Sequence, residues 1–326
     1  MPVASTIGDL GEFGLIARVT ARFPETDDVI LGPGDDAAVV GAPDRRVVAT
    51  MDVLVEGAHF RRDWSAARDV GHKAVAQNCA DVEAMGARPT ALLIGLAVPG
   101  DLPVAWVDGF TEGVRAECAA AGAAVVGGDT VRSERIAVSV TALGSLDGGR
   151  AVTRSGARAG DSVAVTGPLG LSAAGMELLA SGVEEEAVEK AGARAALDEH
   201  RRPGPPYGAG PRAARAGATA MLDVSDGLLQ DLGHIAEASG VAVDVRRSAL
   251  APPPGLAEAA ALLAGYGHRR EAADYMLAGG EDHALAAAFP PGAVPAGWAV
   301  IGEIREGRGV TVDGRAPAPS GWDHFG

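Results

Sequence analysis

Residues 147–161 read DGGRAVTRSGARAGD, a run of glycine, arginine and small residues between two long apolar segments. Such a run offers few side chains to a core, and its glycines favour irregular backbone. The chain has 326 residues, enough for two domains that each bury a core. We therefore place a boundary here, with an N-terminal domain over residues 1–147 and a C-terminal domain over residues 148–326.

The N-terminal domain alternates between helix and strand patterns. Apolar residues recur at helical spacing in residues 11–23, 67–89 and 103–122. Apolar or β-branched runs predict strands at residues 45–60 (where the run ends in a loop), 90–99, 123–130 and 135–146. This order mixes helical crossovers with a hairpin. We therefore expect an α+β domain around a mixed or antiparallel sheet rather than a doubly wound one.

The C-terminal domain repeats an apolar strand that ends in a turn and is followed by a helix. This pattern occurs in residues 162–182, with a glycine turn, and in residues 218–240, with an acidic turn. Residues 184–200 indicate a charged helical segment with a solvated face, and residues 201–212 a rigid proline-rich loop. Strands in 276–289 and 298–304 close the domain. The chain is thus predicted to be a two-domain α+β protein.

The composition excludes several classes of function. The formal net charge is −15, from 28 basic and 43 acidic residues, which argues against broad electrostatic binding of nucleic acid. The first residues do not match a signal peptide, and no run of about 18 apolar residues predicts a membrane span. Cys79 and Cys118 form no CxxC pair, so we expect no thiolate zinc site but two buried thiols in a reducing cytoplasm.

Acidic residues beside glycines or at the ends of predicted elements are the main functional signal. The nucleotide P-loop GxxxxGK[ST], the G-x-S-x-G elbow and the HRD and DFG kinase motifs do not occur. Loops at element ends are where functional residues concentrate. The acidic stretches are GPGDDA with Asp35 and Asp36, ATMD with Asp52, CADVE with Asp81, GGDT with Asp129, LDVSDG with Asp223 and Asp226, and GGEDH with Glu281 and Asp282.

Several carboxylates that converge at buried element ends need cations between them, because a buried carboxylate without a counter-charge is costly. Hard oxygen ligands without Cys or His suit Mg²⁺, which also binds phosphate oxygens. Glycines let the backbone approach phosphate closely. The combination predicts several Mg²⁺ ions with a polyphosphate, and a phosphoryl transfer in which positioning and charge neutralisation supply most of the catalysis.

Each motif taken alone also has a purely structural interpretation. GDD and GGED occur as simple turns, and GGDT can end a strand. Ser225 or Asp226 can cap the following helix by accepting hydrogen bonds from first-turn amides. His59, after VEGA, is of a type common in surface loops. Their joint presence in one chain favours the functional interpretation.

In this order, the stretches resemble the bacterial thiamine-monophosphate kinases, a family within the aminoimidazole-ribonucleotide-synthetase-like ATP-binding superfamily. The resemblance spans nearly the whole chain. It is carried by GEFGLIAR, GPGDDAAVV, MDVLVEGAHF, KAVAQNCADVEAMGARP, VVGGDT, GRAVTRSGARAGD, VTGPLGLSAAG, LDVSDGLLQDLGHI, AGGEDHAL and a terminal GWDHFG. Selenophosphate synthetases share the aspartates and glycines, but not the pairing of VEGAHF with WDHF.

The resemblance implies ATP-dependent phosphorylation of thiamine monophosphate to thiamine diphosphate, the final step of thiamine diphosphate biosynthesis. It also implies several Mg²⁺ ions and a homodimer built through the N-terminal domains, without nucleic-acid or membrane partners. The implied metal ligands are Asp36, Thr50, Met51, Asp52, Asp81, Asp129, Asp223 and Asp226. The implied ATP contacts are Gly128, Asp129, Arg154 and Ser225, and the implied substrate contacts are His59, Glu281 and Trp322.

Three positions depart from the family's usual pattern. Met51 stands where Thr or Ser is usual, which weakens a metal site that needs a hydroxyl but not one that uses the backbone carbonyl. Ala80 stands where Ser is usual. Trp322 stands where Tyr is frequent, and its indole should stack on a flat cationic ring at least as well.

We expect Asp36, Asp52, Asp129 and Asp223 to act in catalysis by holding Mg²⁺ ions, together with Asp81, between two polyanions. The acceptor is itself a phosphate with a second pKa of about 6, so no general base is required. ATP is expected in a cleft between domains or at a dimer interface beside the N-terminal sheet. Two alternatives stay open: a superfamily ATPase that activates a formyl, carbamoyl or selenium-containing substrate, and a nucleotide-binding scaffold without catalysis.

Overall fold

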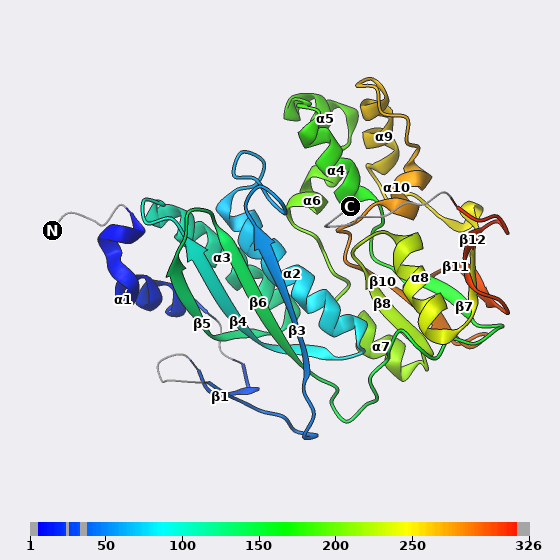
Figure 1. Cartoon of the computed structure of the whole chain (residues 1–326), viewed down its shortest axis with the longest axis horizontal. Coiled ribbons are helices and arrows are strands. Elements are labelled where there is room, and N and C mark those ends of the chain that lie inside the picture. Colours follow the sequence, from blue (N-terminus) through cyan, green and yellow to red (C-terminus); the bar gives the residue numbers. More distant parts are fainter. Residues whose placement is uncertain (1–5, 24–25, 33–37, 318–326) are drawn as a thin grey trace. The chain divides into compact units, whose positions relative to one another are not determined.

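A computed structural model describes residues 6–23, 26–32 and 38–317 (Figure 1). The chain divides into two compact units, the first of Met1–Val82 with Ala87–Gly148 and the second of Glu83–Gly86 with Gly149–Gly326. Each unit has its own β-sheet with helices packed against it. Within the described ranges, no helix is long and apolar enough to cross a membrane.

The first unit is built on a four-stranded sheet with the order β3-β6-β4-β5. Its strands are β3 (Val48–Val55), β4 (Arg88–Val98), β5 (Ala124–Arg132) and β6 (Ala137–Ser145). β6 pairs antiparallel with β3 and β4, whereas β4 and β5 are parallel and are connected by helix α3 (Val104–Ala121). β3 and β5 are therefore edge strands of this sheet.

Helices α2 (Ala67–Ala84) and α3 approach each other closely because glycines lie at their contact. A Cβ atom on Gly71 would lie 2.1 Å from the carbonyl oxygen of Phe110, and one on Gly113 would lie 2.0 Å from that of Arg68. Helix α2 also packs on the sheet, since a Cβ atom on Gly144 of β6 would lie 2.3 Å from the side chain of Val82. Glycine at these positions sets the separation of the layers.

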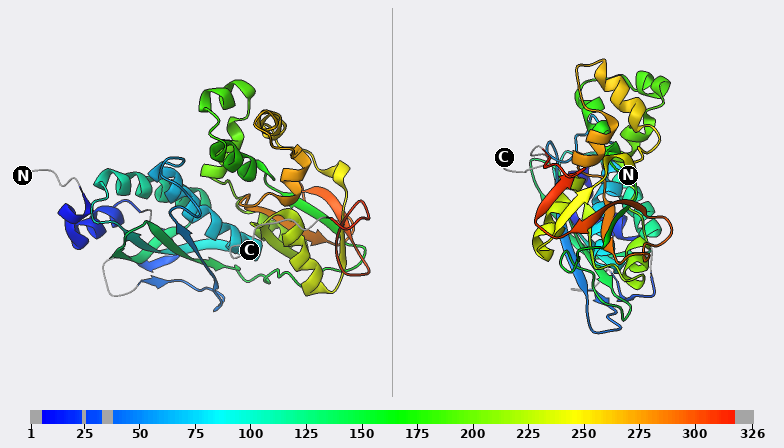
Figure 2. Two further views of the ribbon diagram at one scale, coloured as in Figure 1. Left: turned by 45° about the horizontal axis from the view of Figure 1, so that its top comes forward. Right: turned by 90° about the vertical axis from the view of Figure 1, so that its right-hand side faces the viewer.

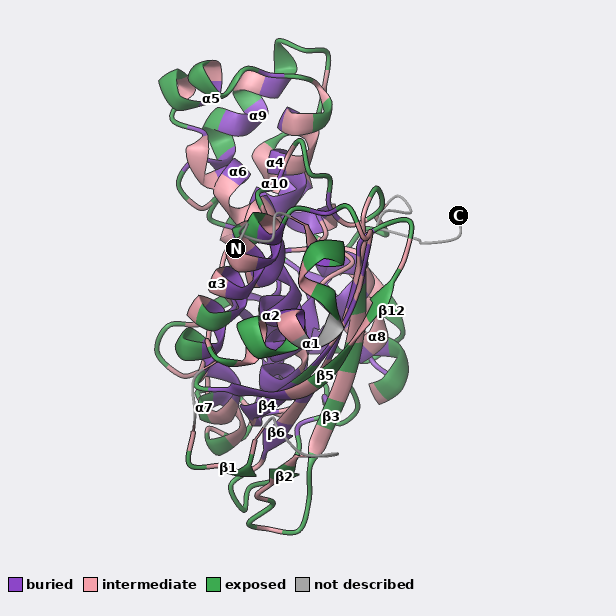
Figure 3. Ribbon diagram, turned by 90° about the vertical axis from the view of Figure 1, so that its left-hand side faces the viewer, coloured by how far each residue is buried: buried purple, intermediate pink, exposed green. Residues whose placement is uncertain are grey.

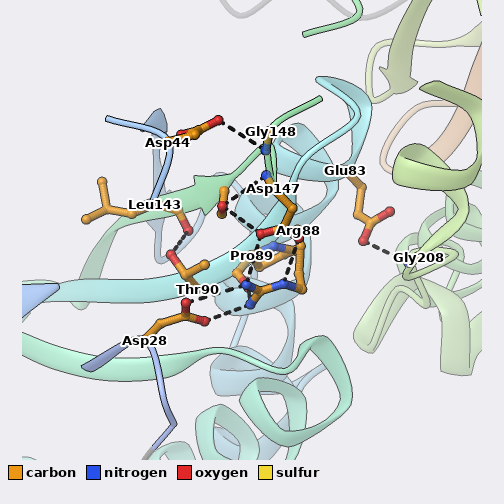
Figure 4. A network of polar contacts seen from close by, with 11 residues as sticks. Asp28, Asp44, Glu83, Arg88, Pro89, Thr90, Leu143, Asp147, Gly148 and Gly208 are labelled. Atoms are coloured by element: carbon orange, nitrogen blue, oxygen red, sulfur yellow. Dashed lines mark hydrogen bonds and ion pairs between the residues drawn. The ribbon is translucent and has the colours of Figure 1, made fainter. Parts of the chain in front are cut away.

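Three small elements complete the first unit. Strands β1 (Val29–Leu31) and β2 (Val39–Val40) form a short antiparallel pair, and helix α1 (Ile7–Thr20) begins at a capping box. Arg88, at the start of β4, donates hydrogen bonds to Asp28 and Asp147 (Figure 4). This arginine ties the segment before β1 to the sheet.

The second unit contains a six-stranded sheet with the order β12-β9-β11-β7-β10-β8. Its strands are β7 (Ser162–Thr166), β8 (Ala220–Val224), β9 (Ala242–Val245), β10 (Ala284–Phe289), β11 (Ala299–Arg305) and β12 (Gly309–Val312). Neighbouring strands are antiparallel, except that β12 runs parallel to β9. Its helices are α4 (Leu171–Ala180), α5 (Glu185–Ala191), α6 (Arg194–Arg201), α7 (Ala209–Arg215), α8 (Leu228–Ser239), α9 (Leu256–Ala264) and α10 (Ala272–Ala278).

Successive side chains of this sheet enter two different apolar cores. Leu222 packs in a core with residues of helices α4, α8 and α9. Its neighbour Met221 packs on the opposite face with Ala209 and Ala213 of α7. Helices therefore cover both faces of the sheet in the second unit (Figure 2).

The predicted α+β class is confirmed, but several predicted elements are wrong in detail. Helix α2 ends at Ala84, and Pro89 lies within β4 at a register shift, where a strand tolerates proline. Residues 184–200 form two helices with buried Val188 and Leu197 rather than one solvated segment. Helix α7 begins inside the predicted proline-rich loop, and α10 occupies the start of the strand predicted from residue 276.

Candidate functional site

Three predicted metal ligands of the first unit lie together on β3 and α2. Thr50 and Asp52 are two residues apart on β3, so their side chains lie on the same face of the sheet. The Thr50 hydroxyl donates a 2.7 Å hydrogen bond to the Asp81 carboxylate on α2. The backbone N–H of Asp52 donates to the side-chain oxygen of buried Asn78 over 2.9 Å, one helical turn before Asp81. We call Thr50, Asp52 and Asp81 the β3–α2 cluster.

Two of the three departures from the family pattern, Met51 and Ala80, lie beside this cluster. Met51 is 59% exposed, and its side chain lies on the opposite face of β3. Only the backbone of Met51 could therefore contribute a metal ligand at the cluster. Ala80 is fully buried in α2, and thus occupies a packed position rather than an open one.

Gly128 and Asp129 lie on β5, at the opposite edge of the same sheet. The register across β6 and β4 aligns Asp52 with Gly128, three strand spacings or about 14 Å away. Asp129, one residue further, has its side chain on the other face, where it is exposed. Within one chain, the sheet does not bring Asp129 to the β3–α2 cluster. Gly128 is required sterically, because a Cβ atom there would lie 1.9 Å from the carbonyl oxygen of Ile94.

His59 lies in the loop after β3. Its Nδ1 accepts a 3.1 Å hydrogen bond from the backbone N–H of Val55, so the neutral ring carries its proton on Nε2. Its backbone carbonyl accepts a hydrogen bond from buried Lys73 over 3.3 Å. The loop and the ring are therefore both oriented by α2 and β3.

In the second unit, the turn after β8 and the turn before β10 lie side by side. The backbone N–H of Glu281 donates to the Ser225 carbonyl over 2.7 Å. The His283 ring lies 3.4 Å from the Asp223 carboxylate. The pairing of β8 with β10 thus brings Asp223 and Ser225 of the LDVSDG motif together with Glu281 of the GGEDH motif.

The turn before β10 has an unusual backbone. Glu281 and His283 have φ angles of 62° and 51°, in the left-handed region that residues with side chains rarely adopt. Between them, fully buried Asp282 accepts hydrogen bonds from the N–H groups of Gly170 (2.6 Å) and Ser172 (3.3 Å). Burial raises the pKa of Asp282 well above its ordinary value, although these two N–H groups oppose the shift. Held strain of this kind clusters at functional sites.

Asp231, in the first turn of α8, was not among the predicted residues. Its Oδ2 accepts hydrogen bonds from three consecutive backbone N–H groups, those of Ser225, Asp226 and Gly227, each over 3.1 Å. Burial and then the negative charge of Asp223 raise the pKa of Asp231 to about 7. Gly227 is the N-cap of α8, so the structural alternative in which Ser225 or Asp226 caps this helix is wrong.

Ligand atoms of Asp226, Asp231 and His234 lie within 4.8 Å of one another, which is close enough to share one metal ion. The sequence had predicted only Asp226 of these three. An acidic residue four positions after the glycine that ends an acidic turn, here Gly227, is the sequence signal that points to Asp231.

Arg154 lies in the loop before β7 with an exposed side chain. The hydroxyl of Ser239, the last residue of α8, donates to the Arg154 carbonyl over 3.2 Å. The Ser239 hydroxyl oxygen in turn accepts hydrogen bonds from the N–H groups of Gly156 (3.1 Å) and Ala157 (3.2 Å). Asp36 and Trp322 lie outside the described residues, so their roles stay predictions.

Two family models match the chain in succession. Residues 34–146 match the N-terminal domain of AIR synthase related proteins, and residues 158–315 match the C-terminal domain. The fold and the acidic turns therefore define a protein of the AIR synthase related class.

Curated relatives define the family more narrowly. The thiamine-monophosphate kinase of Mycobacterium tuberculosis (strain H37Rv) is 48% identical over 98% of this chain and 93% of its own length. That of Corynebacterium glutamicum is 40% identical, over 98% of this chain and 95% of its own length. The chain belongs to the thiamine-monophosphate kinase family.

Solved structures agree with this placement. The thiamine-monophosphate kinase of Stenotrophomonas maltophilia K279a superimposes with a TM-score of 0.80 at 35% identity, over 93% of this chain and 96% of that one. A structure described as AaThiL complexed with AMPPCP and TMP gives a TM-score of 0.76 at 36% identity, over 99% and 100% of the two chains. The hydrogenase maturation protein HypE, at 18% identity and a TM-score of 0.65, shares the fold alone.

Proposed function

We propose that this protein transfers the terminal phosphoryl group of ATP to the phosphate of thiamine monophosphate and so forms thiamine diphosphate. The observation that carries the proposal is full-length similarity to thiamine-monophosphate kinases, among them a structure that holds AMPPCP and TMP. The alternative of another superfamily ATPase is less favoured, because the similarity of this chain to the hydrogenase maturation protein HypE extends to the fold alone. We also propose a cytoplasmic location for this reaction.

We propose Mg²⁺ as the cofactor, held by the β3–α2 cluster in the first unit and by Asp223 and Asp226 in the second. The donor sets fit, because they consist of carboxylate and hydroxyl oxygens without sulfur. Bound Mg²⁺ would neutralise the phosphate charges that otherwise keep donor and acceptor apart. In the first unit, Thr50 orients Asp81, and Asn78 fixes the backbone of Asp52. Asp36 is a further proposed ligand.

For the substrates, we propose that Gly128, Asp129, Arg154 and Ser225 contact ATP. We propose that His59, Glu281 and Trp322 contact thiamine monophosphate. The Glu281 carboxylate lies 3.4 Å from the His200 ring, and its strained backbone is fixed by Asp282. Since the acceptor phosphate is largely ionised at neutral pH, none of these groups needs to remove a proton.

We further propose a homodimer formed through the face of the first unit's sheet that lies opposite α2, beyond the end of that face where β1 and β2 pack. The register aligns Met51 with Leu93 across β6, and Val53 follows on the same face; Met51, Leu93 and Val53 are 59%, 39% and 41% exposed, respectively. Figure 3 shows exposed residues along β3. A row of exposed apolar side chains of this kind is typical of an interaction surface. Asp129 lies on this same face, so association would bring it toward a second copy rather than toward its own β3–α2 cluster.

A product assay with ATP, Mg²⁺ and thiamine monophosphate tests the function. We expect thiamine diphosphate and ADP in equal amounts, and little turnover when unphosphorylated thiamine replaces the monophosphate, because its hydroxyl needs a base and offers no charge to a metal. ATP consumption without thiamine diphosphate would favour another superfamily ATPase. Nucleotide binding without any turnover would favour a scaffold.

A further inference from the structure

The turn after β8 is held by the protein's own carboxylate. The N–H groups of Ser225, Asp226 and Gly227 converge on a single oxygen of Asp231, which is only 3% exposed. Consecutive backbone N–H groups that point at one site form a concavity that typically binds an anion. Here Asp231 fills that concavity, so these amides are already satisfied.

This contact has a direct consequence for recognition at the turn. A phosphate cannot accept hydrogen bonds from amides that Asp231 already occupies. Any hydrogen bond that residues 225–227 donate to a phosphate must therefore come from a side chain such as the Ser225 hydroxyl, and not from these three amides. Asp231 determines where the side chains of Ser225 and Asp226 lie, because it fixes the backbone that carries them.

The opposite end of the same helix holds a second loop. Ser239 ends α8, and its hydroxyl contacts three backbone groups of the loop that carries Arg154. Asp231 and Ser239 are eight residues apart, which corresponds to about 12 Å along a helix. Helix α8 also packs its apolar side in the core through Leu232 and Ile235, which are almost fully buried. It is thus a rigid element between two loops.

We propose that helix α8 sets the separation of the two loops proposed to contact ATP, with Asp231 and Ser239 as positioning residues that touch neither substrate. This inference rests on the proposed function only in that Ser225 and Arg154 are assigned to ATP. Loss of either residue should weaken ATP binding while thiamine monophosphate binding changes little.

The test compares steady-state kinetics of Asp231→Ala, Asp231→Asn and Ser239→Ala with matched controls. Asp244→Ala removes another buried carboxylate, which accepts hydrogen bonds from Thr311 and Gly314. Asp244 lies on β9, near the edge of the sheet opposite β8. Ser181→Ala removes a hydroxyl that contacts His268. Neither control residue belongs to the proposed site, so each should lower thermal stability without changing the KM for ATP.

We expect Asp231→Ala to raise the KM for ATP at least about tenfold, and Ser239→Ala about threefold, with the KM for thiamine monophosphate within about twofold of wild type. Asp231→Asn retains an oxygen that can accept all three hydrogen bonds, so its KM for ATP should stay within about threefold. An unchanged KM for ATP in folded Asp231→Ala would overturn the proposal. If circular dichroism shows that this variant is unfolded, Ser239→Ala decides the question by the same criterion.

Titration with AMPPCP and Mg²⁺ separates this inference from the proposed function. If wild-type protein binds AMPPCP but makes no thiamine diphosphate, the function fails, and weaker AMPPCP binding by the variants still supports the inference. If thiamine diphosphate forms at wild-type rates and KM values in Asp231→Ala, the function stands and the inference fails. Wild-type protein that binds no nucleotide would overturn both.

Discussion

Asp52 has its side chain in the β3–α2 cluster and its backbone N–H bonded to Asn78. We predict that Asp52→Asn lowers turnover about a hundredfold, since removal of a preorganised charge stabiliser costs roughly 3 kcal/mol in the barrier. The backbone contact with Asn78 is retained, so urea unfolding should match wild type. Exposed Asp101→Asn in the same unit is the control and should leave turnover unchanged. Full activity in Asp52→Asn would remove it from the proposed ligands.

Asp282 provides a prediction for pH. Its pKa is raised in the folded protein chiefly by burial and to a lesser extent by Glu199, against the N–H groups of Gly170 and Ser172 and the charge of His283. The folded state therefore keeps a proton that the unfolded chain releases above about pH 4. Asp282 accordingly destabilises the fold increasingly as pH rises from about 4 toward its raised pKa.

Asp282→Asn cannot titrate and should lose this pH dependence. We predict that the unfolding free energy of Asp282→Asn, relative to wild type, increases between pH 4 and pH 7, whatever its absolute value. Urea unfolding at several pH values measures this difference. A difference that stays constant across the range would show that Asp282 has the same pKa in the folded and unfolded chain.

At the residue scale, the sequence indicated Asp223 and Glu281 as candidates, because acidic residues beside glycines are visible as motifs, and the fold places both at adjoining turns together with Ser225. The sequence did not identify Asp231, because an acidic residue in a first helical turn has an ordinary explanation in the helix dipole. The positive φ angles of Glu281 and His283 could not be predicted either, because glutamate and histidine usually avoid that backbone conformation. Such features depend on the neighbouring strand and became visible only in the fold.

At the scale of elements, the long amphipathic or apolar segments were predictable and the short alanine-rich ones were not. Helix α3 and strand β7 have clear apolar spacing. Helices α9 and α10 are short and rich in alanine, which fits helix, strand and core alike, so no periodicity distinguished them. Strands β9 and β12 have four residues each, too few to establish an alternating pattern. The burial of Val188 and Leu197 likewise arises from packing against other helices, which a charged local composition concealed.

The contact between α2 and α3 yields a prediction at this scale. Gly113→Ala would place a methyl group 2.0 Å from the carbonyl oxygen of Arg68, so the two helices must move apart. We expect the unfolding free energy to fall by about 3 kcal/mol, as for an overpacked core. Gly233→Ala in α8 is the control, because its Cβ atom meets nothing within 4 Å and alanine favours helix by roughly 0.5–1 kcal/mol. Equal stability of both variants would contradict this account of the helix contact.

At the scale of the whole molecule, the first unit's sheet has a feature that one chain does not explain. β3 carries Thr50 and Asp52 of the β3–α2 cluster, and β5 carries Asp129, but these side chains lie at opposite edges and on opposite faces of the sheet. The sequence placed all these aspartates in one site because it cannot show which strands become edges. A second copy against the exposed part of the sheet face opposite α2 would give Asp129 a partner from outside its own chain.

We therefore predict that Leu93→Glu, in the middle of that face, converts a dimer into a monomer and lowers turnover at least about tenfold. Leu93 is 39% exposed in the single chain, so the charge should not unfold the chain but should oppose burial in an interface. Light scattering after gel filtration should give the mass of one chain, 32.7 kDa, instead of twice that mass. Tyr266→Glu, a 50% exposed position of the second unit, is the control and should remain dimeric and active. A wild-type protein that is monomeric and fully active would exclude the proposed interface, and a dimeric, active Leu93→Glu would place the interface on another surface.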